Sequence, residues 1–269
     1  MVHRPGTSTG RPALGPALLR AVGLLLLCGL SLQLYFGARI ALLAVVAPQS
    51  TTFQRSEFWR LALEKLPVAW SQTWVDDAQI AATLRRAVIA SEDAGFVEHS
   101  GVEWDALEKA WQKNQRAEVA AERRQAQIDK RPAPAAGAKP RPVVEPKLVG
   151  GSTISQQLAK NLFLSGERTA LRKAQEFVLT LALEAVLGKR RILEIYLNNV
   201  EWGEGVFGAQ AAARHYFRTD AVNLNSTAAA RLAVMLPAPK RFEKNPGSAY
   251  VSGRAATISA RMGAVALPR

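Results

Sequence analysis

The sequence predicts a mainly α-helical protein with one membrane-spanning helix near its N-terminus. Three observations support this fold class. Residues 21–38 (AVGLLLLCGLSLQLYFGA) carry no charge, later segments repeat apolar residues at helical spacing, and no run alternates apolar and polar residues as strands do. The chain has 269 residues, of which 48% are hydrophobic, so it can bury a core as one large domain or two small ones.

Composition and charge exclude several classes of protein. Cys28 is the one cysteine, so an intramolecular disulfide framework and a cysteine zinc cluster are both excluded. The three histidines, His3, His99 and His215, are too scattered for a histidine metal site. The formal net charge of +13 leaves nucleic acid, an anionic membrane surface and a phosphorylated substrate open as partners.

The apolar run predicts an uncleaved anchor rather than a signal peptide. Together with its flanks it covers residues 18–47, which at about 1.5 Å per residue exceeds a hydrocarbon core of roughly 30 Å. A cleaved signal peptide is the alternative, but its apolar region is usually only about 7–15 residues long. Arg4, Arg11 and Arg20 precede the run and no acid does, which predicts a cytoplasmic N-terminus. The expected parts are a cytoplasmic basic tail (1–17), a transmembrane anchor (18–47) and an outer domain (48–269).

The next hundred residues divide into a helical part and a linker. Residues 49–111 are predicted to be helical, with Leu84, Ala87 and Val88 on an apolar face. Residues 113–147 form a Pro/Ala-rich segment without aromatic residues, for which we expect a frayed helix that ends near Lys130 and then a disordered or polyproline-type linker.

Four helices are predicted after residue 148. Residues 170–187 give the strongest pattern and are expected to end with Gly188 at the C-terminal cap. The others cover residues 189–200, 208–217 and 226–237, the last with Ser226 or Thr227 as its N-cap.

The helix at 170–187 carries a narrow polar stripe on an otherwise apolar surface. The stripe consists of Arg172, Lys173, Glu176, Thr180 and Glu184, at spacings that place them on one face. An amphipathic surface helix is the simplest interpretation, but the apolar arc is too wide for one. The sequence therefore predicts a central helix whose stripe faces a cleft or a paired polar network.

Two other segments carry polar groups of the kinds that transfer protons or bind anions. In residues 91–101 (SEDAGFVEHSG), a carboxylate beside apolar residues could have a raised pKa and transfer protons, although acidic pairs usually cap helices or face solvent. Residues 150–162 (GGSTISQQLAKNL) begin with two glycines. The segment and its continuation offer several donors and cations, namely Ser152, Thr153, Gln156, Gln157, Lys160, Arg168, Arg172 and Lys173. Such a set suits a phosphate or pyrophosphate, and a basic helix start is the structural alternative.

Two familiar motifs are excluded. Gly203, Gly205 and Gly208 match a dinucleotide-binding pattern, but a predicted helix precedes them where that fold needs a strand. The sequence has no Ser-x-x-Lys and no Lys-Thr-Gly, so it lacks the motifs of penicillin-binding acyl transfer.

Taken together, these segments resemble the peptidoglycan glycosyltransferase family, the transglycosylases that polymerise lipid II. The resemblance covers about residues 80–245. The matching residues are Glu92, Asp93, Phe96, His99 and Gly101, then Gly150–Leu162, then Arg172, Lys173 and Glu176, and finally 191–217 (RILEIYLNNVEWGEGVFGAQAAARHYF). Without an acyl-transfer domain, the chain looks like the monofunctional biosynthetic enzyme of Gram-negative bacteria.

The resemblance implies a fold, a reaction and a set of site residues. The fold would be a lysozyme-like α-helical lobe with a smaller membrane-proximal lobe. The reaction would join disaccharide units of lipid II by β-1,4 bonds, with inversion and release of undecaprenyl diphosphate. Glu92 would be the general base, and Lys160 and Arg168 would hold the donor pyrophosphate. The remaining site residues would be Glu176 as the second acid, which orients cations, substrate or a metal, and Asp93, Phe96, His99, Ser152, Thr153, Gln156, Gln157, Arg172 and Lys173 around the substrate.

The resemblance also implies partners and a location. The expected partners are lipid II, the growing glycan strand and the membrane, together with other cell-wall synthesis or division proteins, and no nucleic acid. A lipid-linked substrate requires an anchored enzyme, here in the bacterial inner membrane with a periplasmic catalytic domain. No dedicated metal ligands are visible, although a Mg or Mn ion could bridge pyrophosphate and carboxylates.

Three alternative functions and one difference from the family pattern remain open. A glycan-cleaving lysozyme-like enzyme would not need the cationic cluster. A non-catalytic cell-wall scaffold would tolerate Glu92→Gln, and a nucleic-acid binder would interleave aromatic residues with the basic ones. The difference from the family pattern is the 113–147 segment, which looks like an insertion beside the donor site.

Overall fold

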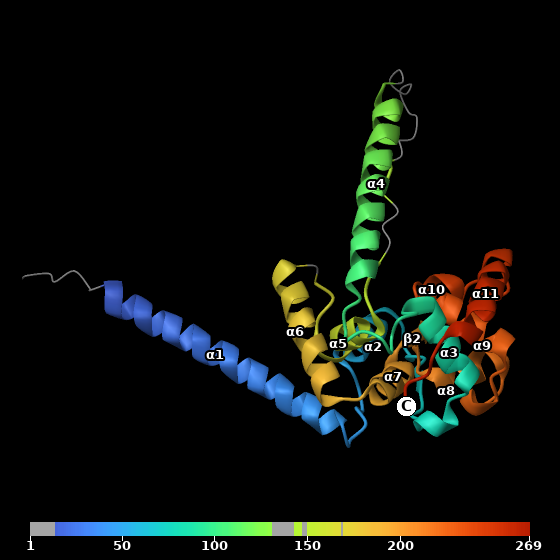
Figure 1. The fold of residues 1–269 in the computed structure, drawn as a ribbon, viewed down its shortest axis with the longest axis horizontal. Helices are drawn as coiled ribbons and strands as arrows, with labels where there is room; N and C mark the ends of the chain where they lie inside the picture. The colour runs from blue at the N-terminus through green and yellow to red at the C-terminus, as the bar shows by residue number, and fades with distance from the viewer. Residues whose placement is uncertain (1–13, 131–142, 147–149, 168) are drawn as a thin grey trace, which may run out of the picture.

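The computed structural model describes residues 14–130, 143–146, 150–167 and 169–269. It shows a helical body from which two long helices project, α1 and α4 (Figure 1). In the part of the chain that is described, the α-helices are α1 (Leu14–Leu43), α2 (Thr52–Glu64), α3 (Ala82–Glu92), α4 (Trp104–Asp129), α5 (Ile154–Phe163), α6 (Ala170–Val186), α7 (Lys189–Asn199), α8 (Ala209–Phe217), α9 (Ser226–Met235), α10 (Pro239–Phe242) and α11 (Ala249–Arg261). The mainly α-helical prediction is confirmed.

Helix α1 leaves the body and docks on it only at its C-terminal end. Gly15–Leu43 is long and apolar enough to cross a membrane, and its leucines are exposed over most of its length. At the docked end Ile40 is fully buried, and the ring of Phe36 lies 5.6 Å from that of Phe163 on α5. Gln33 exchanges two side-chain hydrogen bonds with Gln175 on α6. The anchor is thus joined to the helices that follow the linker.

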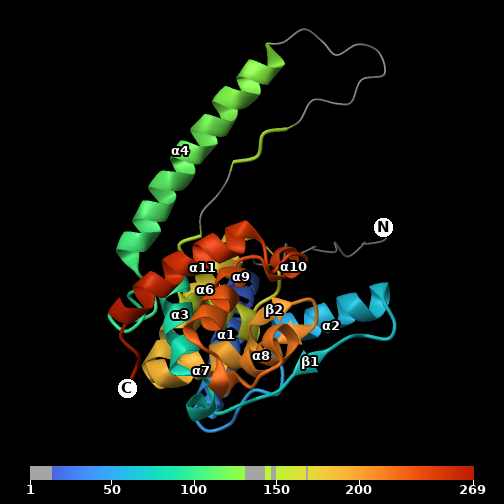
Figure 2. The ribbon, with the colours of Figure 1, turned by 90° about the vertical axis from the view of Figure 1, so that its right-hand side faces the viewer.

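One part of the hydrophobic core lies between α3, α9 and α11, and α5 to α8 contribute the rest of it. Leu84, Ala87 and Val88 of α3 are fully buried, as the apolar face predicted. Helix α9 packs closely on them because small alanines such as Ala229 and Ala233 face the contact. Helix α11 covers both (Figure 2). The last residue of α3 is Glu92, so this packing fixes the position of the candidate base.

Three very short strands in the described residues form one small sheet. They are β1 (Ser71–Gln72), β2 (Glu201–Gly203) and β3 (Val206–Phe207), in the order β1-β3-β2, with β1–β3 parallel and β2–β3 antiparallel. Strands of two or three residues are too short to show an alternating pattern, so the sequence did not predict them.

Two predicted caps are wrong. Asn225, not Ser226 or Thr227, caps α9, because its side chain accepts from the backbone N–H of Ala228. Gly188 has φ −68° and is the N-cap of α7, so it does not end α6 in the left-handed conformation that a glycine cap takes. Leu187 is the C-cap of α6, and the next residue, Gly188, is already the N-cap of α7.

Helix α4 forms an arm that projects from the body (Figure 1). It ends at Asp129, next to the predicted end at Lys130, and Val144 of the returning chain donates to Gln125 Oε1 at 2.9 Å. The first half of the 113–147 segment is therefore a continuous helix. Much of the predicted linker, residues 131–142 and 147–149, lies outside the described residues.

Candidate functional site

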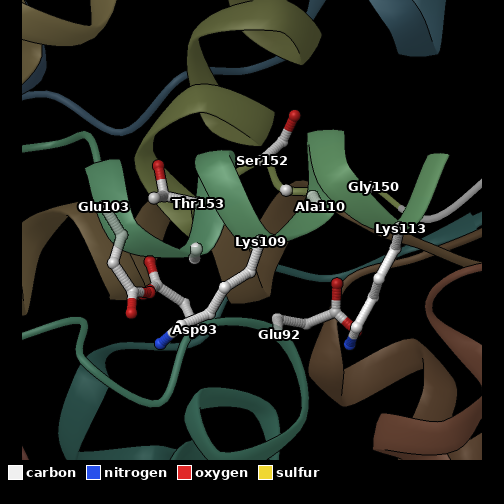
Figure 3. A pocket seen from close by; sticks show the side chains of 11 residues that line it. Glu92, Asp93, Glu103, Lys109, Ala110, Lys113, Gly150, Ser152 and Thr153 are labelled. Carbon is white, nitrogen blue, oxygen red and sulfur yellow. The ribbon is translucent and has the colours of Figure 1, made fainter. Parts of the chain in front are cut away.

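The first candidate cavity, which we call the Glu92 cavity, lies where three segments meet. These are the end of α3, the first turns of α4 and the stretch that precedes α5 (Figure 3). Its volume is about 240 Å³. It is lined by Glu92, Asp93, Glu103, Ala106, Lys109, Ala110, Lys113, Gly150, Gly151, Ser152 and Thr153.

Glu92 is partly buried, and a chain of hydrogen bonds between uncharged side chains positions its carboxylate. Gln157 Nε2 donates to its Oε2 at 3.0 Å, and the phenol of the buried Tyr196 donates to Gln157 Oε1 at 2.9 Å. Burial raises the pKa of Glu92, with a smaller contribution from Asp93, and the bond from Gln157 acts in the opposite direction. A carboxylate in this setting accepts a proton more readily than an exposed one.

Asp93 has both carboxylate oxygens committed within the fold. Oδ1 lies 2.8 Å from His99 Nε2, and Oδ2 accepts from the backbone N–H of Ile154 at 3.0 Å. The backbone N–H of Gly101 donates to His99 Nδ1 at 3.1 Å, so the ring proton is assigned to Nε2 and points at Asp93. The buried Asp93 therefore fastens the start of α5 to the end of α3.

The start of α5 uses its polar side chains as a cap. Thr153 Oγ1 accepts from the backbone N–H of Gln156 at 3.2 Å, and Gln156 Oε1 accepts from that of Thr153 at 3.1 Å. This reciprocal pair is a capping box, so both residues are buried and satisfied. A Cβ on Gly151 would lie 2.9 Å from the Cβ of Ala110, so the glycine lets α4 approach this turn.

The second candidate cavity, which we call the Lys160 cavity, lies near the other end of α5. Its volume is about 350 Å³, and it is lined by Phe53, Ser56, Glu57, Lys160, Asn161, Leu164, Ser165, Gly166 and Arg172. Lys160 lies three residues after Gln157, so one helical turn, about 5 Å, separates the two side chains on a shared face of α5. The two cavities thus share one rigid helix.

Glu176 is buried and paired with two cations. Its Oε2 lies 3.1 Å from Arg172 Nη1, and its Oε1 pairs with Lys173 Nζ. Arg172 faces the Lys160 cavity, while the side chain of Lys173 is half exposed. Arg168, the other predicted pyrophosphate ligand, lies outside the described residues.

The other end of the polar stripe on α6 forms a paired network. Glu184 Oε1 accepts from Lys189 Nζ at 2.7 Å and also pairs with Ser155 Oγ. The ring of Phe96 is fully buried, with Lys189 Nζ 4.5 Å from its centroid. Phe96 therefore packs beneath the site and does not reach its surface. The stripe faces a cleft at one end and forms a paired network at the other. The prediction of a central helix is wrong, because the apolar Leu171 and Val178 of α6 are exposed.

One group of side chains has the composition of a metal site. Ligand atoms of Asp93, His99 and Glu103 lie within 4.8 Å of one another. A cation there would have to replace the hydrogen bond between Asp93 and His99, and Asp93 would keep its bond to Ile154. These residues fit a hydrogen-bonded network better than a ligand set, so we route no step through a metal.

Sequence reasoning missed three residues that the structure brings to the site. Tyr196 lies in a motif that was noticed, but its buried phenol could be assigned only once the fold placed α7 beside α5. Lys109 and Lys113 line the Glu92 cavity and point from α4 toward the two carboxylates (Figure 3). Their spacing of four residues on a predicted helix was the available signal.

Comparison with known proteins identifies the family of the chain. A family model described as Transglycosylase matches residues 61–124 and 141–263. A protein of Paraburkholderia phytofirmans named biosynthetic peptidoglycan transglycosylase is 45% identical over 240 residues, which cover 89% of this chain and 88% of that protein. A protein of the same name from Burkholderia pseudomallei is 48% identical over 239 residues, which cover 89% of this chain and 83% of that one. The interruption of the family match falls within the 113–147 segment.

Proposed function

The chain belongs to the transglycosylase family, and from that premise we propose that it polymerises lipid II into linear peptidoglycan strands. The observation that supports this most is the pairing of a base and a cationic pocket on one helix. Glu92 is held by Gln157, and Lys160 follows one turn later on α5. A glycosyl transfer that releases a diphosphate needs both a proton acceptor for the attacking hydroxyl and cations for the leaving group.

In the proposed reaction, the 4-hydroxyl oxygen of the acceptor sugar attacks the anomeric carbon of the donor. Glu92 takes the hydroxyl proton as the new C–O bond forms and the bond to the diphosphate breaks, with inversion at the carbon. The electron pair leaves with undecaprenyl diphosphate, whose growing negative charge Lys160 and Arg172 stabilise from their cavity. Arg168 is assigned to the same diphosphate from its sequence position.

The remaining predicted residues divide by role. Glu176 positions Arg172 and Lys173, because both of its carboxylate oxygens are already paired with these two cations. Asp93, His99, Thr153 and Gln156 hold α5 against α3, and Phe96 packs below them. Ser152 lines the Glu92 cavity, where it is available to substrate, whereas Gln157 positions Glu92. We assign no resident metal to these residues.

The anchor supports a location at the inner membrane. We infer that α1 spans the bilayer once, with residues 1–17 in the cytoplasm and residues 48–269 in the periplasm, because the arginines before the span have no acidic counterpart. Fusions of a periplasm-active reporter to each end test this orientation, and activity at the N-terminal fusion alone would reverse it.

The test of function is polymerisation of labelled lipid II by the full chain in detergent. We expect the wild type to form glycan strands and Glu92→Gln to lose about a hundredfold or more of the rate. Glu98→Gln is the matched control, because Glu98 is an exposed carboxylate six residues further along the chain, and it should keep wild-type activity.

Two outcomes would overturn the proposal in favour of its rivals. A wild type that shortens preformed glycan and makes none is a lysozyme-like hydrolase. A wild type that binds lipid II without converting it, as well as Glu92→Gln does, is a scaffold for other cell-wall synthesis or division proteins.

A further inference from the structure

The arm helix α4 separates its charges by face. At about 100° per residue, all of its lysines and arginines fall within about 50° of one line along the helix. These residues, which we call the basic stripe, are Lys109, Lys113, Arg116, Arg123 and Arg124. The acidic residues beyond the first turn, Glu108, Glu118, Glu122 and Asp129, fall on the opposite side, whereas Asp105 in the first turn lies on the side of the basic stripe.

This arrangement has a cost that a merely solvated helix would avoid. Lys109 and Lys113 are four residues apart, where like charges destabilise a helix, and opposite charges at that spacing would stabilise it. All five side chains of the basic stripe are exposed, and none makes an ion pair with the part of the chain that the structure describes. The basic stripe is therefore available to an anionic ligand.

The basic stripe starts inside the Glu92 cavity and runs outward from it. Lys109 and Lys113 line that cavity, and Arg116, Arg123 and Arg124 line a shallow groove further along the arm. From Lys109 to Arg124 the helix rises about 22 Å. A ligand that follows the basic stripe is thus an extended molecule whose end reaches Glu92.

The basic stripe faces away from the membrane anchor. At the base of the arm, Trp104 contacts Phe177 of α6, with their ring centroids 6.1 Å apart, and α6 in turn packs against α1. Trp104 lies about 140° around the helix from Lys109. Figure 1 shows the arm rising beside α6 on the side away from α1. Anionic lipid headgroups are therefore the less suitable ligand.

We propose that the basic stripe of α4 binds the peptide-bearing glycan strand through the carboxylates of its peptides while the strand's end lies in the Glu92 cavity. This inference rests on the proposed function, which supplies the strand. Each peptide of such a strand ends in a carboxylate, so a polymer presents anionic groups repeatedly along its length. Exposed arginines form hydrogen-bonded ion pairs with carboxylates, often through two N–H groups.

The experiment compares two variants of the full chain in detergent. In the first, Arg116, Arg123 and Arg124 are all replaced by Gln, which leaves the cavity lysines in place. In the control, Glu118→Gln and Glu122→Gln neutralise the opposite face of the same helix. The probes are lipid-free glycan strands with their peptides, and the same strands after the peptides have been removed.

We expect the triple variant to bind peptide-bearing strands about tenfold more weakly, since an exposed ion pair contributes up to a factor of about five. Its affinity should also depend less on salt. It should form the first glycosidic bond at the wild-type rate and release shorter products. The control should match the wild type in each assay, and strands without peptides should bind wild type and triple variant equally weakly.

Three results decide against the proposal or its premise. Equal binding of peptide-bearing strands by wild type and triple variant overturns the inference. A triple variant that loses affinity for vesicles containing anionic lipid, but not for strands, makes the basic stripe a membrane contact and also overturns it. A wild type that makes no glycan overturns the proposed function, while the binding of purified strands still decides whether the basic stripe holds them.

Discussion

The Glu92 cavity and the Lys160 cavity hold their carboxylates in opposite ways. Neutral donors contact Glu92, namely the Gln157 amide and, more distantly, the Ser91 hydroxyl, and burial raises its pKa. In the Lys160 cavity, Glu57 pairs with Arg60 and Lys240. Glu176, behind the same cavity, pairs with Arg172 and Lys173.

This difference in partners distinguishes a carboxylate that can accept a proton from a cavity whose cations can bind an anion. A carboxylate that is partnered by neutral groups remains able to gain a proton. Burial alone would raise the pKa of Glu57, but its pairs with Lys240 and Arg60 lower that pKa. The paired acids also fix the cations that face the cavity. Two acidic residues that look alike in the sequence, Glu92 and Glu176, thus take different roles because their neighbours differ.

The largest expected effect tests whether Asp93 is structural and Glu92 chemical. Asp93→Ala leaves His99 and the backbone N–H of Ile154 without their buried acceptor, so we expect about 2–4 kcal/mol lower free energy of unfolding and loss of polymerisation. Glu92→Gln should lose activity without that destabilisation. Burial raises the pKa of Glu92 in the folded state, so the free energy of unfolding falls as rising pH ionises this carboxyl. A Gln at this position does not ionise, so the variant avoids that decrease in stability.

Denaturant unfolding at pH 8 of both variants, each beside the wild type, makes the comparison. Destabilisation of Glu92→Gln by as much as Asp93→Ala would mean that the two carboxylates share one structural role, and the contrast between the cavities would be wrong.

A smaller effect is expected in the Lys160 cavity. Lys160→Met keeps the length of the side chain but removes its charge, so we expect kcat/KM for lipid II to fall about tenfold or more with little change in unfolding. The matched control is Lys244→Met, an exposed lysine in the loop between α10 and α11. Raising the salt concentration should narrow the gap between wild type and Lys160→Met, since salt weakens the interaction that the variant lacks. A uniform loss of activity in both variants would contradict a specific role for Lys160.

The sequence predicted α6 to α9 but not α10 or α11, and it was insufficient for the partners of the polar residues. The apolar spacing in α3 predicted its buried side, and Leu84 lies in the core accordingly. In α6 the apolar spacing did not, because Glu176 and Thr180 of the polar stripe are buried. The apolar Leu171 and Val178 of the same helix are exposed. Nothing in the sequence distinguishes Gln156, which closes the cap of α5, from its neighbour Gln157, which holds Glu92. Their side chains differ by about 100° around one helix, and only the packing of α5 against α3 and α7 decides which one faces the site.

The smallest expected effect separates positioning from chemistry within the Glu92 cavity. Glu92 must be ionised to accept a proton, so activity should fall as the pH drops through its pKa, which burial places above the ordinary value. The bond from Gln157 lowers that pKa, so Gln157→Leu should move the acid limb of kcat/KM to higher pH. Tyr196→Phe, which frees Gln157 Oε1 of its donor, should move it in the same direction by less.

A pH profile distinguishes this from a purely structural role, because loosened packing would lower kcat/KM by the same factor at every pH. We expect Gln157→Leu to lose activity relative to the wild type on the acid limb of the profile and to approach the wild type on its alkaline side, since more Glu92 is ionised there whatever its neighbours. A limb that moved to lower pH would mean that Gln157 does not stabilise the ionised carboxylate. Glu92 would then owe its basicity to burial alone, and the neutral hydrogen bonds that set its cavity apart from that of Lys160 would serve only to hold α5 in place.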